Sequence, residues 1–369
     1  MKVLFFSRGR GRGHAVPDMA LVAELRQLEP RADIRLISYG TGAATLTRCG
    51  HSVINLQLPD NNAFLETYRR VACVIARLSP NVVIAHEEFA AAPAAKLFGL
   101  PVYFLTDFFA SPAHIWMESL AYADEVIFID EPGIHEPPAY LRDKIYYTGP
   151  IIRPFAYCPD DRLRARSELR LQSDAVVVLV LPGGWLNEKR APIVDLVMPA
   201  FKSLPFEKKV LVWIAGQDSE LLQARYRDDS DVIVKELDWQ IDRWMVACDV
   251  AITKGTRITS LELASLGVPS ISLSFGLNRP DDIRVARIPS NTALDARTLN
   301  SQRLAAEILR ILQTQRPAAP SSDACIQSGL SATAARLAAH LAMIREQCAA
   351  RTGDARPTGY GDGLACRAR

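Results

Sequence analysis

The residues with the clearest chemical potential lie in the segment 248–275, which reads CDVAITKGTRITSLELASLGVPSISLSF. A β-rich run meets the turn Lys254-Gly255-Thr256, and apolar residues then recur at helical spacing. A strand that turns through glycine into a helix directs free backbone N–H groups and the positive helix end at a ligand above the sheet. The segment therefore predicts a phosphate or diphosphate site, although an ordinary strand–helix crossover has the same pattern. Glu262, inside the predicted helix, can accept hydrogen bonds from ribose hydroxyls or remain a solvated surface residue.

A glycine-rich loop follows the first predicted strand. Gly9, Gly11 and Gly13 are spaced as GxGxG, with arginines between them that suit a loop facing an anion. A GxGxxG dinucleotide fingerprint counted from Gly9 needs a third glycine where the chain has His14, and counting from Gly11 fails as well, so a nicotinamide site fits poorly. His14 opens the next helix beside the expected cleft. It can act there as a general base or a hydrogen-bond donor, or it can cap the helix.

Two further candidates belong to the second half and to the junction before it. Gly183-Gly184 occupies the position that the first glycine loop has in the first half, and it serves either a close approach to a ligand or a tight turn. Arg153 follows a proline-rich junction. It can hold a phosphate across the cleft or remain a surface arginine.

Acidic residues collect at the ends of predicted strands in the first half. Asp107 ends one strand and His86-Glu87-Glu88 ends another, so each carboxylate is a candidate catalytic base or a partner for a helix dipole. The run 228–231 contains a DxD, the pattern that can hold a divalent cation against a diphosphate. It precedes the amino end of a strand, away from the ligand-binding edge of a sheet. We therefore predict a solvated turn and no obligate metal.

The elements that must position these residues alternate as strand and helix. The predicted strands are 2–6, 34–38, 82–85, 102–105, 126–129, 175–181, 209–214, 232–235 and 249–253. Such alternation predicts an α/β fold, with two doubly wound parallel sheets that are each covered by helices on both faces. Two halves of this kind place a cleft between the carboxyl ends of their strands, where open α/β folds bind ligands.

Changes in composition divide the chain into four parts. Segment 131–159 is rich in proline and turn residues and marks a junction. We predict an amino-terminal Rossmann-like domain at 1–150 and a carboxyl-terminal Rossmann-like domain at 151–315. A linker and a last helix follow at 316–349, and 350–369 is expected to be a disordered tail.

Bulk composition excludes several classes of protein. The chain has 369 residues, enough for two domains, and its hydrophobic fraction of 49% is that of a soluble globular protein. A net charge of +2 gives no reason to expect a nucleic-acid partner. The 7 cysteines form no CxxC pair, which favours reduced thiols in the cytoplasm. No apolar run approaches the length of about 20 residues that spans a membrane, so we expect a cytoplasmic protein with at most peripheral contact at the inner face of the membrane.

The arrangement resembles the two-domain GT-B glycosyltransferases, and most of all the subgroup of the UDP-GlcNAc transferase that makes lipid II. The similarity covers nearly all of the chain before the last helix. The family's first glycine loop ends in GGH, as in Gly13-His14 here, and its GNPVR junction resembles 149–153. The most specific match is a pattern in the second half that falls on Asp249, Gly255, Thr256, Thr259, Glu262 and Gly267-Val268-Pro269.

The resemblance implies a donor site in the second half. The amides of Gly255 and Thr256 would hold a diphosphate, Glu262 the ribose, and the loop Asp238-Trp239 would border the base. In the first half, Gly13 would contact the donor and His14 would face the acceptor and the diphosphate. Arg153 would reach the phosphates from the junction.

One single residue and one pair of residues depart from the family. Lys254 replaces a serine and can itself pair with a phosphate. Asp281-Asp282 stands where the family has Gln-Gln, which reads the donor sugar. The hydrophobic membrane patch of a lipid-acceptor enzyme is not evident in the first half, so the acceptor stays open.

The resemblance implies a hexosyl- or N-acetylhexosaminyl-type glycosyltransferase that uses a UDP or TDP sugar. The transfer to an acceptor hydroxyl, on a small molecule, a glycan or a lipid-linked molecule, would be inverting and metal-independent. It would need no cofactor, because the nucleotide sugar is a substrate. His14 or Asp107 would take the acceptor proton, and the helix end with Lys254 and Arg153 would stabilise the departing diphosphate. The alternatives are a nucleotide-sugar hydrolase or 2-epimerase of the same fold, and a non-catalytic nucleotide-sugar-binding protein.

Overall fold

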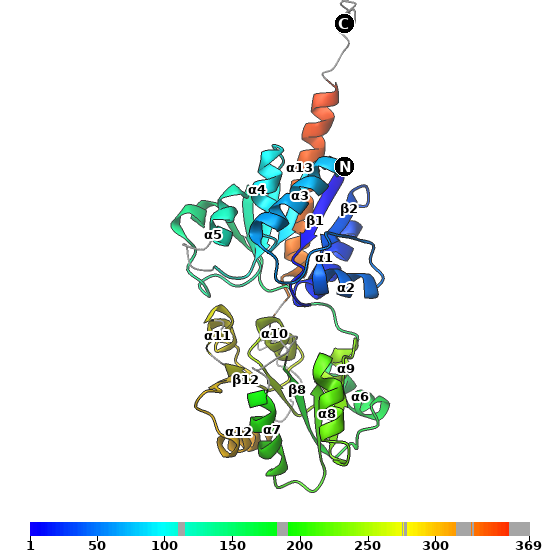
Figure 1. The fold of residues 1–369 in the computed structure, drawn as a ribbon, viewed down its shortest axis with the longest axis vertical. Helices are drawn as coiled ribbons and strands as arrows, with labels where there is room; N and C mark the ends of the chain where they lie inside the picture. The colour runs from blue at the N-terminus through cyan, green and yellow to red at the C-terminus, as the bar shows by residue number, and fades with distance from the viewer. Residues whose placement is uncertain are drawn as a thin grey trace, which may run out of the picture.

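The structure of the protein is a computed structural model that describes residues 1–109, 115–182, 191–274, 276, 279–314, 326 and 328–353. At 115, 116, 191, 192, 217, 279–281 and 351–353 only the backbone is described. Two parallel sheets, each with its own helices, lie one beyond the other along the long axis of the molecule (Figure 1). The predicted α/β fold with two doubly wound sheets is confirmed.

The first sheet has 7 strands in the order β3-β2-β1-β4-β5-β6-β7, all paired in parallel. They are β1 (Lys2–Ser7), β2 (Asp33–Ser38), β3 (Val53–Asn55), β4 (Val82–His86), β5 (Val102–Thr106), β6 (Glu125–Phe128) and β7 (Ile145–Tyr147). Because β1 pairs with both β2 and β4, the strands before β4 are added on one side of β1, and the strands from β4 onward are added on the other side. The loops after β1 and β4 therefore lie at a topological switch point, where ligands bind in such sheets.

Helices cover both faces of the first sheet. They are α1 (Ala15–Leu28), α2 (Gly40–Arg48), α3 (Phe64–Leu78), α4 (Ala91–Leu97), α5 (Ile115–Ser119) and α13 (Leu330–Gly353), with short 3-10 turns η1 (Leu120–Tyr122) and η2 (Ala139–Lys144). Apolar side chains of α3 and α4 form the core on one face, and those of α1 and α13 form it on the other. Each strand alternates its side chains between these two cores, which explains its nearly continuous apolar sequence.

The second sheet has 6 parallel strands in the order β10-β9-β8-β11-β12-β13. They are β8 (Val176–Leu181), β9 (Lys209–Ile214), β10 (Val232–Lys235), β11 (Val250–Thr253), β12 (Ser270–Ser274) and β13 (Asn291–Asp295). Its helices are α6 (Arg162–Glu168), α7 (Ala191–Lys202), α8 (Ser219–Arg225), α9 (Ile241–Ala247), α10 (Arg257–Ser265), α11 (Arg279–Val285) and α12 (Ser301–Thr314), with 3-10 turns η3 (Pro159–Asp161) and η4 (Gly216–Asp218). Again β8 lies between β9 and β11, so the switch point faces the loops after β8 and β11.

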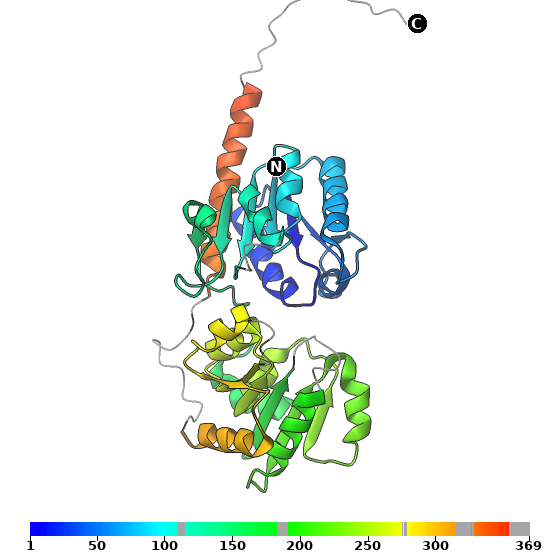
Figure 2. The ribbon, with the colours of Figure 1, turned by 60° about the vertical axis from the view of Figure 1, so that its left-hand side comes forward.

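The last helix returns to the first half of the molecule. Figure 2 shows α13 running beside the first sheet, and its residues Leu337 and Leu341 are fully buried in the core that α1 shares. On its outer side Arg336 forms an ion pair with Glu125 of β6. The helix α13 continues to Gly353, past the predicted end of the last helix at 349, and residues 354–369 of the predicted tail lie outside the described part.

Within the described residues, no helix has the length and apolarity needed to cross a membrane. The cysteines of this part that are assigned a state, Cys49, Cys73, Cys158, Cys248 and Cys348, are free thiols.

Candidate active site

His14 lies between the glycine loop and α1, at the switch point of the first sheet. It is the N-cap residue of α1, but its side chain makes no capping hydrogen bond, so the capping alternative is excluded. Its Nε2 lies instead 2.7 Å from Oε2 of Glu87. The side chain of His14 is therefore paired with a carboxylate and does not cap the helix.

Glu87 follows β4 and is held in an unusual conformation. Its backbone φ is +50°, a value that residues other than glycine rarely adopt. Its buried carboxylate also accepts hydrogen bonds from Nη1 of Arg8, at 3.3 Å, and from Oγ1 of Thr106, at 3.3 Å. Backbone strain of this kind gathers at functional sites.

Electrostatics make the pair a neutral base beside an ionised acid. Burial lowers the pKa of His14 below its usual value, although Glu87 opposes the shift. Burial alone would raise the pKa of Glu87, but the charges of His14 and Arg8 outweigh it and hold that pKa below its usual range. The Nε2–H of His14 then donates to Glu87, which leaves the lone pair on Nδ1. Within the described part of the chain this buried Nδ1 has no hydrogen-bond partner.

A second histidine–carboxylate pair lies against the first. Nδ1 of His86 is 2.6 Å from Oδ1 of Asp18, both side chains are buried, and the ring of His86 stands 4.9 Å from that of His14. Burial would lower the pKa of His86, but Asp18 outweighs it and raises this pKa. His14, His86 and Glu87 offer ligand atoms within 4.8 Å of one another and could hold a metal ion. Arg8 pairs with Glu87, and the raised pKa of His86 favours its protonated form beside Asp18, so both carboxylates already have a positive partner in this structure.

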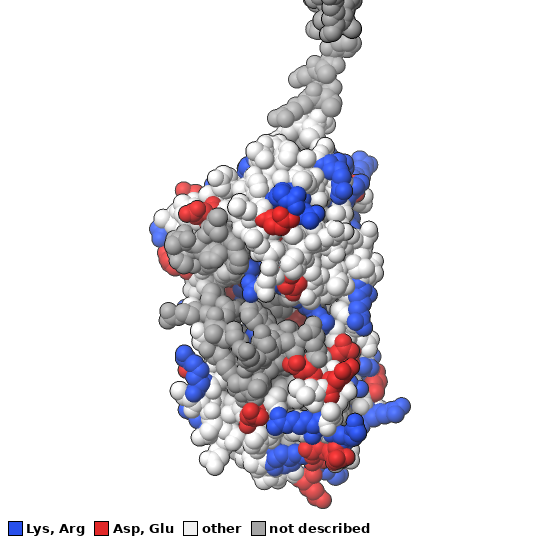
Figure 3. Space-filling view, in the orientation of Figure 1, with Lys and Arg blue, Asp and Glu red and all other residues white. Residues whose placement is uncertain are grey.

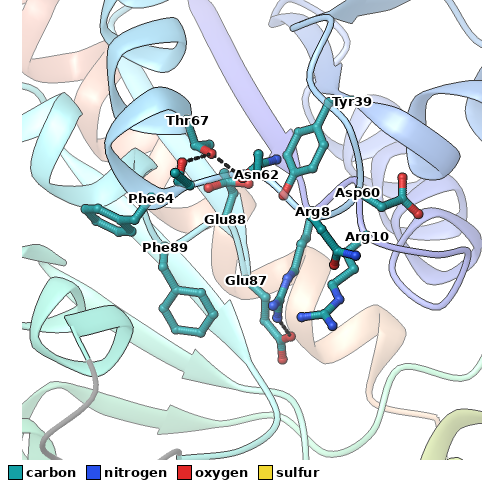
Figure 4. A pocket seen from close by; sticks show the side chains of 12 residues that line it. Arg8, Arg10, Tyr39, Asp60, Asn62, Phe64, Thr67, Glu87, Glu88 and Phe89 are labelled. Carbon is teal, nitrogen blue, oxygen red and sulfur yellow. Dashed lines mark hydrogen bonds and ion pairs between the residues drawn. The ribbon is translucent and has the colours of Figure 1, made fainter.

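A cavity of about 330 Å³ opens beside Glu87. Figure 4 shows Phe64 and Phe89 on one side of it, and Tyr39, Asp60 and Arg10 on the other. Burial raises the pKa of Glu88, which also lines the cavity, to about 7, so this carboxyl can donate as well as accept hydrogen bonds near neutral pH. The cavity thus presents aromatic faces together with hydroxyl, amide, carboxyl and guanidinium groups.

The start of α10 in the second half has the geometry expected of an anion site. Gly255 has φ +70°, and a Cβ there would lie 3.4 Å from the carbonyl oxygen of Leu273. Thr256 is the N-cap residue, and its side chain makes no capping hydrogen bond. The first amides of α10 therefore remain available to a ligand, together with the positive end of the helix dipole.

Arg153 and Glu262 contact each other. Nε of Arg153 lies 2.7 Å from Oε1 of Glu262, and the two side chains are 16% and 9% exposed. In this structure Arg153 therefore holds Glu262 rather than a phosphate. Nη2 of Arg153 is buried and has no partner among the described residues, so the guanidinium retains a free donor.

The two members of the loop Asp238-Trp239 differ in role. The carboxylate of Asp238 accepts hydrogen bonds from Nε1 of Trp244, at 2.7 Å, and from the amide of Gln240, at 2.9 Å, so it shapes the loop. Trp239 is 37% exposed, and its ring lies near the guanidinium groups of arginines 12 and 48 in the first half, 5.9 Å and 5.2 Å away. Trp239 thus lies where the two halves meet, whereas Asp238 is engaged within its own loop.

Several contacts join the two halves, and sequence reasoning missed three of the residues that make them, Arg257, Arg284 and Asp130. Arg257 of α10 forms a buried ion pair with Asp107, and Nε of Arg284 in α11 lies 3.0 Å from Oδ1 of Asp130. A Cβ on Gly13 would lie 3.9 Å from Ile258 of α10, so the glycine loop faces the start of that helix. In Figure 3, Lys and Arg side chains are visible where the halves meet. The position of Arg257 directly after Lys-Gly-Thr was the available signal.

Some predicted site residues cannot be placed. Gly183 and Gly184 lie outside the described residues, and the side chain of Asp281 is not described. Asp282 is partly buried on α11, and Lys254 is partly buried before α10. In the DxD run, Asp229 forms an ion pair with Lys202, as a charged turn does.

No protein-family model matches the chain. Solved structures do resemble it. MurG of Acinetobacter baumannii superposes with a TM-score of 0.63 at 15% identity, covering 90% of this chain and 98% of that one. The chain has the GT-B fold. A putative UDP-N-acetylglucosamine 2-epimerase of Listeria monocytogenes has a TM-score of 0.68 at 15% identity, with 94% and 97% covered. S. aureus MnaA, solved with UDP, has a TM-score of 0.67 at 14% identity, with 98% and 100% covered. The GT-B fold thus hosts different reactions, and the residues of this chain have to distinguish them.

Proposed function

We propose that the protein is a glycosyltransferase that moves a sugar from a nucleoside diphosphate, UDP or TDP, to an acceptor hydroxyl. One observation carries the proposal. A neutral histidine oriented by a buried carboxylate lies in the first half, and the uncapped start of α10 faces its loop from the second half. The S. aureus structure with UDP supports a nucleoside diphosphate as the ligand of this fold.

The acceptor hydroxyl is activated from the first half. We propose that the acceptor binds in the cavity that Glu87 lines. Its hydroxyl then reaches Nδ1 of His14, which is buried and has no partner among the described residues, and gives its proton to that nitrogen. Glu87 keeps the Nε2–H in place and stabilises the imidazolium that forms, as the carboxylate of a catalytic triad does. We propose His14 rather than Asp107 as the base, since the Asp107 carboxylate is paired with Arg257.

The leaving diphosphate is stabilised from the second half. The amides of Gly255 and Thr256, directly before α10, hold it, with Lys254 beside them, which supplies charge stabilisation without a metal. In this structure the Gly255 amide donates to Oγ1 of Thr253, so the diphosphate takes the place of that hydroxyl. Glu262, held by Arg153, binds the ribose, and Trp239 stacks on the base. Attack from the opposite half displaces the diphosphate in one step, so the anomeric configuration inverts.

Two further groups complete the proposed donor site. Gly13 and Gly183-Gly184 give the backbone close access to the donor, and Asp281-Asp282 binds hydroxyls of the transferred sugar. Asp238 keeps the loop of Trp239 in shape.

The test pairs binding with turnover. UDP and TDP sugars are screened by thermal shift, where a ligand at about 100 times its Kd adds about 2.7 kcal/mol of stability. The best donor is then assayed with an acceptor panel, using wild type and His14→Ala. We expect His14→Ala to lose about 100-fold to 10,000-fold in kcat while the donor still stabilises it. If no UDP or TDP sugar stabilises the wild type, the proposal is wrong.

A second candidate is a nucleotide-sugar hydrolase or 2-epimerase, favoured by the similarity to the Listeria protein. Such an enzyme converts the nucleotide sugar with no acceptor present. Turnover of the donor alone, at a rate that added acceptors do not raise, would select this candidate over the transferase. Donor binding without turnover under any condition would indicate a non-catalytic binding protein.

A further inference from the structure

Arg257 and Asp107 meet across the cleft from opposite halves. Arg257 is the first residue of α10, and Asp107 follows β5. Nη1 of Arg257 donates a hydrogen bond to the carbonyl oxygen of Asp107 at 2.9 Å, and the guanidinium also pairs with the Asp107 carboxylate. The two side chains are only 8% and 9% exposed. The pair is therefore largely removed from water.

The position of Arg257 is that of a phosphate ligand. A buried guanidinium needs an anionic partner, because an unpaired buried charge is strongly destabilising. Arg257 begins α10, whose N-cap Thr256 makes no side-chain capping hydrogen bond, so the guanidinium charge and the helix dipole act on the same region. Arg257 also acts electrostatically on His86. Its charge therefore acts at the start of α10 and also on His86 of the first half.

We infer that Arg257 is a ligand of the donor diphosphate and that Asp107 occupies its guanidinium until the donor binds. The inference rests on the donor site of the proposed function. A diphosphate offers Arg257 the same bidentate, charge-assisted pairing as a carboxylate, so the exchange keeps the guanidinium compensated and releases the Asp107 carboxylate from it. Asp107 then competes with the donor for Arg257. This role and the role of a catalytic base predict different affinities for UDP when Asp107 is replaced.

The two roles of Asp107 make opposite predictions for nucleotide affinity. If Asp107 competes with the diphosphate, Asp107→Asn frees Arg257 and UDP binds more tightly. If Asp107 is a base, the same change lowers turnover and leaves the affinity for UDP as it was. Binding of UDP, measured without a sugar or an acceptor, therefore separates them.

The experiment is a double-mutant cycle on the full-length chain, read by calorimetric titration with UDP and with TDP. We expect Asp107→Asn to lower the Kd at least about fivefold. We expect Arg257→Ala to raise it about 10-fold to 100-fold, and Arg257→Lys, which loses the planar fork, to raise it less. In the Arg257→Ala background, Asp107→Asn should no longer change the Kd. Thermal melts confirm that each variant is folded, and Arg257→Lys keeps the test open if Arg257→Ala does not fold.

The pair between Asp130 and Arg284 supplies a matched control. It also joins the halves, with Nε and Oδ1 3.0 Å apart, but it involves α11 rather than the start of α10. Asp130→Asn should leave the Kd for UDP unchanged. Equal tightening in Asp130→Asn and Asp107→Asn would mean that loosening the halves is the cause, and would overturn the inference. Unchanged or weaker binding in Asp107→Asn would overturn it as well. A wild type that binds neither UDP nor TDP would instead refute the donor site of the proposed function.

Discussion

At the scale of single residues, the pair of His14 and Glu87 decides how the first half can move a proton. The imidazole lies in a mostly buried site that favours its neutral form, and the carboxylate stays ionised because it accepts the hydrogen bond of His14 and faces the charge of Arg8. The pair thus combines a base that is ready near neutral pH with an anion that stabilises the base once it is protonated. Neither residue would do this alone.

Glu87→Gln should test this coupling through the pH profile of kcat. His14 is active when neutral, so activity falls as the pH drops through its pKa, which burial holds below 6.5. Glu87 raises that pKa, so removing its charge should move the acid limb to lower pH. The plateau should drop by about 10-fold to 100-fold, because the imidazolium loses its partner. An acid limb that stays in place would show that Glu87 does not act on the titrating group.

Glu66→Gln serves as the control for that measurement. Glu66 is an exposed carboxylate on α3 whose pKa is lowered to about 2 by hydrogen bonds from Arg69 and Arg70. Its removal changes a well-paired acid that does not line the cavity beside Glu87. We expect the same pH profile as the wild type.

The sequence predicted part of this residue-scale chemistry. His14 was singled out because it follows a glycine loop at a strand end, and Glu87 was considered because it ends a strand. Their hydrogen bond joins positions 73 residues apart and depends on the positive φ of Glu87. Neither the distance nor the backbone conformation can be read from one sequence.

At the scale of elements, the turn between β11 and α10 carries the donor site. Gly255 lets the chain turn into the helix with its first amides facing the cleft, and Thr256 leaves them uncapped. The strand, the turn and the helix were all predicted in order, because apolar periodicity and a glycine are local signals.

Gly255→Ala should therefore damage both stability and binding. A side chain at φ +70° costs about 1–2 kcal/mol, and the new Cβ lies 3.4 Å from a backbone oxygen. We expect a lower melting temperature and about 10-fold weaker binding of UDP, since the amides shift. Titration calorimetry and thermal melts measure the two effects.

Gly99→Ala separates strain from site damage. Gly99 has φ +66°, nothing lies within 4 Å of its Cβ position, and it follows α4 rather than the donor turn. It should lower the melting temperature and leave the Kd for UDP unchanged. A loss of binding in this variant would point to general destabilisation instead of the turn.

At the scale of the whole molecule, the chain leaves the first half, builds the second, and returns to the first through α13. The returning helix completes one face of the first sheet, and the glycines at 149 and 329 let the two crossing segments pass closely. A Cβ on Gly329 would lie 2.2 Å from the carbonyl oxygen of Thr148. The two halves are thus connected at this crossing, and they also contact each other through the ion pairs of Arg257 and Arg284.

Leu337→Ala tests the contribution of α13 to the first half. Leu337 is fully buried between α13, α1 and the sheet, so its truncation should lower the free energy of unfolding by about 2–5 kcal/mol. Met343→Ala, on the same helix but 46% exposed, should change it by less than about 0.5 kcal/mol. Chemical denaturation followed by circular dichroism measures both. Equal effects would mean that α13 is not part of this core.

The sequence by itself determined the alternation of strands and helices, the two-sheet α/β architecture, the glycine turns and the strand-end positions of His14, Asp107 and Gly255. These are local properties, because periodicity, turn residues and motif spacing act over neighbouring positions. Only the tertiary structure decided that His14 pairs with Glu87, that Arg153 holds Glu262, that Asp107 faces Arg257, and that the last helix packs on the first sheet. Each of these is a contact between distant parts of the chain, and it depends on how the halves pack, which no local pattern encodes.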